Sequence, residues 1–533
     1  MIAFTSWLWL FAGASTAGLV KLRDGSSSEP IAVTKNGSYA GVYDGVYKQD
    51  YFLGVPYALP PTGERRFKVP TSLNGTWTGT RDAKSYSKEC VGYGSDQWSY
   101  ETSEDCLYLN VVRPSGYENT KLPVAFWIHG GGYRQGGGVD QRYNLSFIVQ
   151  NSVEIGKPII GVSINYRLSA WGFLYSREMK GSGNTNLGLR DQRLALHWLR
   201  ENAEGFGGDP DKVTIFGESA GGSSVGFHLT AYNGRDDKLF RAAAMESGNP
   251  VAYFALKTSE WYQPLYNAIS AQAGCNTTLN SLECLRSVPF ETLNNIINGT
   301  TTASDGTPLR SAFMPTVDGD FIARYTSLQL ADGSFVKVPI ISGAYPDDPS
   351  VNVIASLNQT RPPQPYGPQY RRAASYYGDA IFIAARRLTC ATWASHNITA
   401  YCYRFNAITA NVNSVVAVTH FQEVAFVFGN TQGVGYAPLN RNPFEGKGEA
   451  TVALALARFV CSSWVGFVSD LDPNGWREGA GWKGREVAWP RYDVGNPMNI
   501  VLDANVSSYA EPDTYRAEGM KLINDNNFGV YRR

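Results

Sequence analysis

The stretch Val213-Thr214-Ile215-Phe216-Gly217-Glu218-Ser219-Ala220-Gly221 decides how this chain folds. Its first four residues form a mostly apolar run that predicts a buried strand, and the small residues of 222–227 can begin a helix. The Gly-x-Ser-x-Gly between them is typical of a sharp strand-to-helix turn that exposes a serine hydroxyl, with glycine where strand and helix close up. The stretch therefore predicts a nucleophile, Ser219, at the end of a sheet strand.

Three consecutive glycines follow another apolar run, residues 124–128, in His129-Gly130-Gly131-Gly132-Tyr133. Such a run costs chain entropy, and one reason to keep it is that its N–H groups can turn inward with no side chain in the way. Inward amides stabilise the negative oxygen of a tetrahedral intermediate, and one such donor typically lowers the barrier by ~3–4 kcal/mol. We predict an oxyanion hole made by the backbone N–H groups of Gly131, Gly132 and Ala220. The alternative is a plain flexible turn.

A base for the serine must come from one of five histidines. In hydrolases with this serine turn, the histidine comes last, on a loop after a late strand. His420 fits that order, because it lies between a predicted loop and the apolar residues 424–428. The other four are expected to be structural or exposed: His129, His197, His228 and His396.

Apolar runs alternate with helical periodicity along the chain, which favours a mostly parallel sheet with helices on both faces. Strands are expected at 124–128, 159–164, 213–216, 242–245, 338–341 and 400–405, and helices at 187–202 and 450–468. Residues 253–308 and 359–394 are interpreted as helix- and loop-rich insertions that cover the sheet above the active site. The expected organisation is one α/β domain spanning 18–533.

These stretches resemble the type-B carboxylesterase family, the group that contains cholinesterases and a set of large fungal lipases. The most specific pieces are Glu104-Asp105-Cys106-Leu107-Tyr108-Leu109-Asn110, Phe206-Gly207-Gly208-Asp209-Pro210 and the stretch 213–221. Further support comes from Phe52-Leu53-Gly54-Val55-Pro56-Tyr57-Ala58, Asn165-Tyr166-Arg167-Leu168, and His420 followed by Glu423. The resemblance implies the α/β-hydrolase fold, ester hydrolysis and two local disulfides.

The acid of the triad is where this sequence departs from the family pattern, which usually has Asp-Glu-Gly with the glutamate as third residue. Here the chain reads Ser342-Gly343-Ala344-Tyr345-Pro346-Asp347-Asp348-Pro349, and Asp348 stands at the glutamate position. An aspartate can accept the histidine's Nδ1–H and fix its tautomer, although its shorter side chain must lie closer. Asp347 is the rival, and a third possibility is that both aspartates only solvate a turn. Glu218 and Ser247 are candidate supporting groups, with a purely structural role as the alternative.

Composition and the N-terminus bear on location. The 533 residues carry 47 Lys+Arg and 47 Asp+Glu, so net charge does not favour nucleic acid or an acidic membrane surface as a partner. Residues 2–14 are mostly apolar and small residues follow, which predicts a secretory signal at 1–17; the alternative is a buried N-terminal strand. No other run reaches the ~18 apolar residues of a membrane span, and no membrane anchor is expected.

Sequons and cysteines also favour export. Eight Asn-x-Ser/Thr sequons occur, at Asn36, Asn74, Asn144, Asn276, Asn298, Asn358, Asn397 and Asn505. Of seven cysteines, Cys90 with Cys106 and Cys275 with Cys284 close short loops and are predicted disulfides. Cys390, Cys402 and Cys461 remain, and Cys461 is the predicted buried free thiol. The cysteine and histidine spacings suggest no metal site, and no cofactor is expected.

Together these features predict a secreted serine carboxylesterase that hydrolyses small-molecule esters through Ser219, His420 and Asp348 and an acyl-enzyme. The loop closed by Cys90 and Cys106 holds fifteen mostly polar residues, shorter than the lid of the family's lipases, so we expect no activation at lipid interfaces. Trp98 in this loop is expected to pack rather than to bind a cation. The alternatives are a lipase or sterol esterase for long-chain esters and, less favoured, a non-catalytic adhesion protein.

Overall fold

The computed structural model describes residues 29–345, 370–410, 412, 418–437, 441–445, 449–482, 484 and 486–533. The predicted signal at 1–17, both candidate acids Asp347 and Asp348, and the sequon at Asn358 lie outside these residues.

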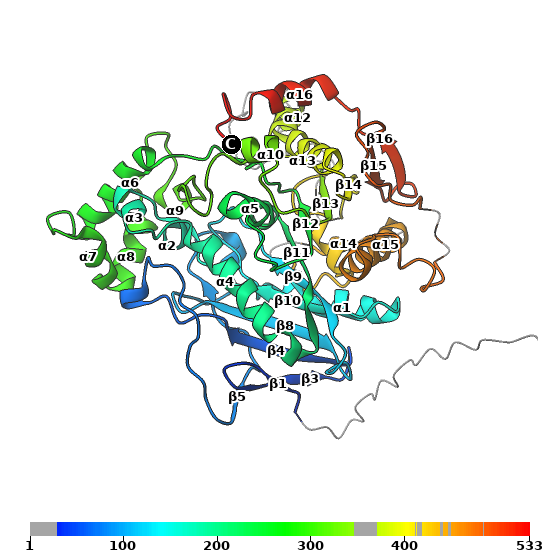
Figure 1. Cartoon of the computed structure of the whole chain (residues 1–533), viewed down its shortest axis with the longest axis horizontal. Helices are drawn as coiled ribbons and strands as arrows, with labels where there is room; N and C mark the ends of the chain where they lie inside the picture. The colour runs from blue at the N-terminus through cyan, green and yellow to red at the C-terminus, as the bar shows by residue number, and fades with distance from the viewer. Residues whose placement is uncertain are drawn as a thin grey trace, which may run out of the picture.

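A large mixed sheet runs through the described chain (Figure 1). Its eleven strands lie in the order β16 (Tyr509–Pro512), β15 (Met498–Leu502), β14 (Ala400–Phe405), β13 (Ile340–Ala344), β12 (Ala242–Glu246), β11 (Gly208–Glu218), β9 (Leu122–Ile128), β10 (Ile160–Ile164), β8 (Tyr108–Pro114), β4 (Gln49–Pro56) and β3 (Val42–Asp44). The seven neighbouring strands β15, β14, β13, β12, β11, β9 and β10 pair in parallel. Strands β8, β4 and β3 at one edge and β16 at the other pair antiparallel. The expected mostly parallel sheet is confirmed. Two small sheets join β1 (Ile31–Val33), β2 (Ser38–Ala40) and β5 (Thr80–Asp82), and β6 (Glu89–Cys90) with β7 (Thr102–Ser103).

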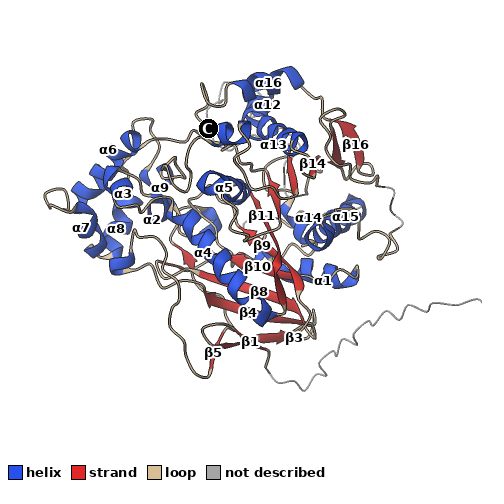
Figure 2. Ribbon diagram, viewed as in Figure 1, coloured by secondary structure: helices blue, strands red, loops and turns tan. Residues whose placement is uncertain are grey.

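Helices lie to either side of the sheet (Figure 2). They are α1 (Leu145–Glu154), α2 (Ser169–Phe173), α3 (Arg177–Gly181), α4 (Leu187–Asn202), α5 (Ala220–Gly234), α6 (Ser259–Gln272), α7 (Ser281–Ser287), α8 (Phe290–Ile297), α9 (Leu309–Ala312), α10 (Thr326–Ala331), α12 (Tyr370–Gly378), α13 (Ala384–Ser395), α14 (Val424–Phe428), α15 (Glu449–Asp470) and α16 (Ala517–Asp525). A π-helical turn, Asp379–Ile383, joins α12 to α13.

Alternation along the central strands divides the core into two layers. In β9, Val124, Phe126 and Ile128 join the core that includes residues of α4 and α5. Ala125 and Trp127 face the opposite way and join the core formed with α1, α14 and α15. Every β9 residue from 124 to 128 is buried, so both faces of the sheet are covered, as a parallel sheet requires.

Helix α15 is the most apolar long element of the described chain. Its segment Val452–Asp470 is long and apolar enough to cross a membrane by length and composition, but 67% of it is buried inside the protein. It packs across β9 and β11 beside α1 and α14. This is the environment of a core helix, for which the same composition is expected.

The chain reverses its direction of travel across the sheet at β9. It passes from β9 outward to β10 and then returns to the other side of β9 to form β11, after which β12, β13 and β14 follow in order. Ligands of open α/β sheets bind at the carboxyl ends of strands next to such a switch. The triple glycine follows β9 and Ser219 follows β11, so both lie at this point.

The turn after β11 has no space for side chains on its glycines. A Cβ at Gly217 would lie 2.6 Å from the carbonyl oxygen of Ile128 and 2.7 Å from the carbonyl carbon of Gly221. A Cβ at Gly221 would overlap the Ile128 carbonyl oxygen and lie 2.9 Å from the backbone of His129. All of these neighbours are backbone atoms, which can move only if the strands move.

Gly221→Ala should therefore destabilise the protein by about 1–3 kcal/mol, the usual range for overpacking. We expect a lower midpoint of thermal unfolding, measured by circular dichroism. Gly181→Ala is the matched control, because a Cβ at exposed Gly181 meets no atom within 4 Å. Equal midpoints for the two variants would contradict the packing argument.

Candidate active site

Ser219 sits at the apex of the turn between β11 and α5 with backbone angles φ 59° and ψ −122°. A positive φ is uncommon for a residue with a side chain and marks local strain. The turn is held because the Ser219 N–H donates to the carbonyl of Glu246 at the end of β12, at 2.8 Å. The side chain faces a cavity of 590 Å³ at the carboxyl ends of the strands.

His420 reaches the serine from the segment between β14 and α14. Its Nε2 lies 2.7 Å from Ser219 Oγ, within hydrogen-bonding distance. Its ring stacks on Phe382 of the π-helical turn, with ring centres 5.4 Å apart. The structure thus brings together the serine and the histidine that the sequence singled out.

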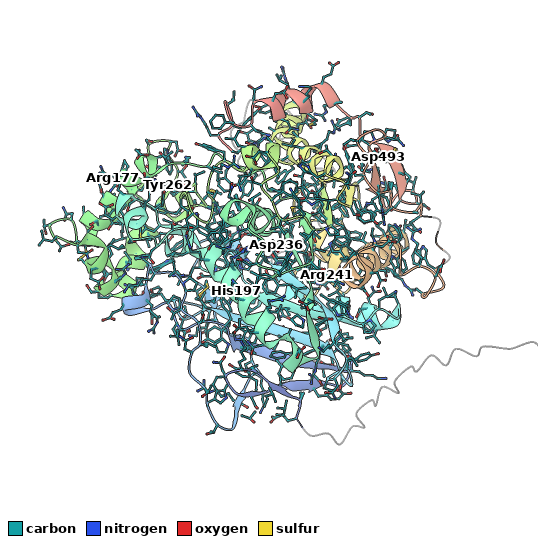
Figure 3. All side chains as sticks on the ribbon, viewed as in Figure 1. Arg177, His197, Asp236, Arg241, Tyr262 and Asp493 are labelled. Atoms are coloured by element: carbon teal, nitrogen blue, oxygen red, sulfur yellow. A yellow bond between two sulfur atoms is a disulfide. The ribbon has the colours of Figure 1, made fainter. Side chains whose placement is uncertain are left out.

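The other four histidines lie away from Ser219 Oγ in roles that differ from a base. His129 Nδ1 bonds the Gly130 carbonyl at 2.8 Å, and its ring stacks on Tyr166, so it shapes the glycine loop. His228 is buried and pairs with Gln192. His197 on α4 (labelled in Figure 3) and His396 are exposed.

The glycine loop after β9 borders the same cavity. Gly131 and Gly132 have φ of 97° and 62°, in the region that favours glycine. A Cβ at Gly130 would lie 3.1 Å from the Ser219 Cβ, so loop and serine are in close contact. Within the described chain, the amides of Gly131, Gly132 and Ala220 donate no hydrogen bond to a protein acceptor. They are therefore available to a ligand oxygen.

Buried carboxylates surround the histidine. Glu218 is 1% exposed, and its Oε1 lies 3.2 Å from His420 Nε2. Ser247 donates to Oε1 of Glu423 at 3.1 Å, so this predicted supporting group contacts the residue three positions after the histidine. Burial raises the pKa of neighbouring Glu246 well above its usual range, with the charge of Glu423 adding to the effect.

The sequence analysis did not single out Tyr345, which the structure places against His420. The residue follows β13 directly and is fully buried, and its hydroxyl lies 3.2 Å from His420 Nδ1. The only sequence signal was its place between a predicted strand and the two aspartates. Asp347 and Asp348 lie outside the described residues, so the position of the predicted acid stays a prediction.

One wall of the cavity comes from the loop closed by Cys90 and Cys106. Asp96 in this loop forms an ion pair with Arg142 at 2.9 Å, and both line the cavity. The Arg142 guanidinium lies over the ring of Phe421, the residue after the histidine, at 4.7 Å. The expectation that Trp98 packs is wrong, because 75% of its surface is exposed; it also lies outside the cavity lining.

The disulfides agree with the expected pairs. The structure contains Cys90–Cys106 and Cys275–Cys284, together with Cys390–Cys402, which ties α13 to β14. Cys461 is a buried free thiol, as the sequence predicted.

Comparison with known proteins agrees with this geometry. A model of the carboxylesterase family matches residues 28–371. This chain belongs to the carboxylesterase family. Among carboxylesterase-family relatives, lipase 4 of Diutina rugosa is 32% identical over 94% of this chain and 96% of its own. Secreted lipase 1 of Botryotinia fuckeliana is 31% identical over 89% of this chain and 88% of its own.

A solved structure resembles the whole fold. The crystal structure of Aspergillus niger EstA has a TM-score of 0.79 at 26% identity, and the match covers 95% of this chain and 99% of that one. The expected α/β-hydrolase fold is confirmed. Family and relatives together make this carboxylesterase-family chain a carboxylic ester hydrolase that acts on ester substrates.

If His420 is the base, as the sequence predicts, the pH dependence of activity should report the state of its imidazole, which must be neutral to take a proton. Burial lowers the pKa of the His420 imidazole from 6.5 to about 4. Protonation on acidification therefore begins later than for an ordinary histidine. We expect the acidic limb of kcat/KM to have its midpoint below pH 6.5, measured by pH-stat titration of butyrate ester hydrolysis. A midpoint at or above 6.5 would show that the imidazole is not held neutral in this way.

Proposed function

We propose that this chain is a secreted serine carboxylesterase that hydrolyses small, soluble carboxylic esters through a covalent acyl-enzyme. The observation that carries the proposal is the 2.7 Å approach of His420 Nε2 to Ser219 Oγ beside three available backbone amides. A nucleophile, a base in reach and donors for the developing oxyanion are the parts that acyl transfer needs.

Acylation begins when Ser219 Oγ attacks the ester carbonyl carbon while His420 Nε2 takes the hydroxyl proton. The carbonyl oxygen becomes negative and accepts hydrogen bonds from the amides of Gly131, Gly132 and Ala220. The carbon–oxygen bond to the alcohol then breaks, and His420 Nε2–H gives its proton to the leaving alkoxide. The acyl group remains on Ser219.

Deacylation repeats these steps with water as the nucleophile. His420 takes a proton from water as the water oxygen attacks the acyl carbon, and the same amides bind the second oxyanion. Collapse breaks the bond to Ser219 Oγ, which recovers its proton from His420 and releases the carboxylic acid. The imidazolium present in both halves is stabilised by the carboxylate of Glu218, 3.2 Å from Nε2. Asp348 is the proposed acid that accepts the Nδ1–H of His420.

The attachment of the Cys90–Cys106 loop supports small, soluble substrates. The Tyr93 N–H donates to the carbonyl of Arg134, next to the glycine loop, at 2.6 Å. The Tyr93 hydroxyl donates to Asn294 of α8 at 2.7 Å, and Gln97 closes the loop on itself through the Cys90 carbonyl. With the Asp96–Arg142 pair, these bonds fix the loop as a wall of the cavity, whereas interfacial activation needs a lid that opens.

A lipase that acts on long-chain esters is the second candidate. Two observations favour it: relatives from several fungi are named lipases, and Trp98 presents an exposed aromatic ring on the loop beside the cavity. Tryptophan is a residue type that inserts readily at a lipid–water boundary.

Export and glycosylation are part of the proposal. Two relatives are named secreted lipases, and disulfides persist in oxidising compartments. Five of the sequon asparagines are exposed and can accept a glycan from the surface: Asn74, Asn276, Asn298, Asn397 and Asn505. Asn36 and Asn144 are half-buried, and their side chains make hydrogen bonds. Residues 18–533 are proposed to form one domain.

Hydrolysis of p-nitrophenyl acetate, butyrate and palmitate, each with and without detergent micelles, separates the two candidates. We expect the highest kcat/KM on acetate or butyrate and no rise in rate at the micelle threshold, because the loop is bonded to the cavity rim. A sharp rise on palmitate above that threshold would favour the lipase. Ser219→Ala is the control that subtracts uncatalysed hydrolysis.

The assignment of the acid is tested by Asp348→Asn and Asp347→Asn, assayed side by side. Loss of a triad carboxylate removes the acceptor that orients the histidine, and losses of up to ~10⁴-fold in kcat are known for such changes. We expect Asp348→Asn to lose much more activity than Asp347→Asn. The reverse order would move the acid to Asp347.

A further inference from the structure

The hydroxyl of Tyr345 sits at a junction of four groups. It lies 3.2 Å from His420 Nδ1, 3.0 Å from Oε1 of Glu423 and 3.4 Å from Oε1 of Glu218. It also accepts the backbone N–H of Phe421 at 3.2 Å. Tyr345 and Glu423 are both fully buried, so water does not reach the hydroxyl directly.

The Tyr345 hydroxyl has one proton, so it can donate its hydrogen bond to only one of these neighbours at a time. A carboxylate only accepts hydrogen bonds, and the carboxylate of Glu423 is the nearer of the two in contact with the phenol. Hydrogen bonds to carboxylates are also about twice as strong as those between neutral groups. The O–H therefore donates to Glu423, and the oxygen keeps its lone pairs for Phe421 N–H and for His420.

This direction decides which nitrogen of His420 carries the proton. With the tyrosine proton on the Glu423 side, His420 Nδ1 can only donate to the phenol oxygen. The neutral ring then carries its proton on Nδ1 and none on Nε2, and Nε2 is the atom that faces Ser219 Oγ. We propose that Tyr345 is a positioning residue that holds His420 in its base-competent tautomer and links the imidazole to the buried carboxylate of Glu423.

The surroundings keep this link intact. Burial, with the nearby charges of Glu423 and Glu218, raises the pKa of Tyr345 well above its usual range, so the phenol keeps its proton. Glu423 Oε1 accepts a second hydrogen bond from Ser247, which fixes the carboxylate from its other side. When His420 becomes an imidazolium, the oriented phenol dipole and the carboxylate beyond it stabilise the charge.

The inference rests on the proposed function, since it gives Tyr345 a task only if His420 serves Ser219. It adds to the proposed role of Asp348, because one N–H can be shared between two acceptors. The link differs from a triad acid in that it passes through a neutral side chain to a carboxylate on the histidine's own segment.

Tyr345→Phe removes the hydroxyl and keeps the ring. We expect kcat on p-nitrophenyl butyrate to fall about 10- to 100-fold with KM changed less than about threefold, because ring orientation matters in the transition state. The matched control is Tyr403→Phe on β14, a fully buried tyrosine whose hydroxyl has no hydrogen-bond partner in the described chain. It should retain the kcat of the unaltered enzyme. Labelling of Ser219 with a fluorophosphonate counts folded sites in each preparation.

Three outcomes decide the matter. Unchanged kcat in Tyr345→Phe, or an equal fall in Tyr403→Phe, overturns the inference while hydrolysis by the unaltered enzyme upholds the proposed function. Absence of turnover and of fluorophosphonate labelling in the unaltered enzyme would overturn the proposed function itself. Should Tyr345→Phe fail to fold, Glu423→Gln replaces it, because the amide keeps an oxygen for the tyrosine proton but removes the charge. It should lower kcat without changing KM, and full activity there would contradict the link.

Discussion

The structure depends on close contact between the backbones that meet at Ser219. The turn after β11 touches the end of β9 through Ile128 and the end of β12 through Glu246, and glycine is what allows each approach. These contacts join backbone to backbone, so the position of the serine hydroxyl relative to the glycine loop follows from the register of three parallel strands. A rigid scaffold of this kind supplies the positioning on which acyl transfer depends.

The polar network behind the histidine is the second requirement. Glu218, Glu246 and Glu423 are all at most 1% exposed, and burial of a carboxylate costs several kcal/mol unless donors compensate it. Donors come from each side: Trp464 of α15 bonds Glu246 at 2.9 Å, and Ser247 and Tyr345 bond Glu423. A mostly apolar helix therefore contributes an indole N–H at the end of the sheet. The charges of Glu218 and Glu423 favour a positive imidazolium, so the proposed catalysis would depend on the same network as the stability of the fold.

Much of the fold could be predicted because apolar runs mark buried parallel strands. The helix expected at 187–202 matches α4, and each of the six expected strands exists. Their ends were harder to place. The strand expected to stop at residue 341 continues to Ala344, since Gly343 leaves space for the ring of Tyr403 on the neighbouring β14. The small residues Ser342, Gly343 and Ala344 are typical of a loop, and the sequence does not show that the Tyr403 ring packs against the glycine.

The missed strand end explains the missed residue. With the strand ending at 341, Tyr345 falls within an expected loop, and nothing in the local sequence relates it to a histidine seventy-five positions later. The sequence also left the pairing of Cys390 and Cys402 open. The two residues meet only because α13 lies alongside β14, which the sequence does not show. Motifs therefore identified the groups on either side of the Ser219–His420 contact, whereas residues that support it from other strands required the three-dimensional arrangement.

The cavity wall connects substrate choice to the same machinery. Opening the Cys90–Cys106 loop would break the bond from Tyr93 to the Arg134 carbonyl, two residues after the last of the three glycines. It would also separate Asp96 from Arg142, whose guanidinium rests on the ring of Phe421 next to the histidine. A loop that moves would thus disturb both the proposed oxyanion donors and the proposed base. In this chain the loop is bonded to the rim of the cavity, which favours an ester that enters a preformed cavity.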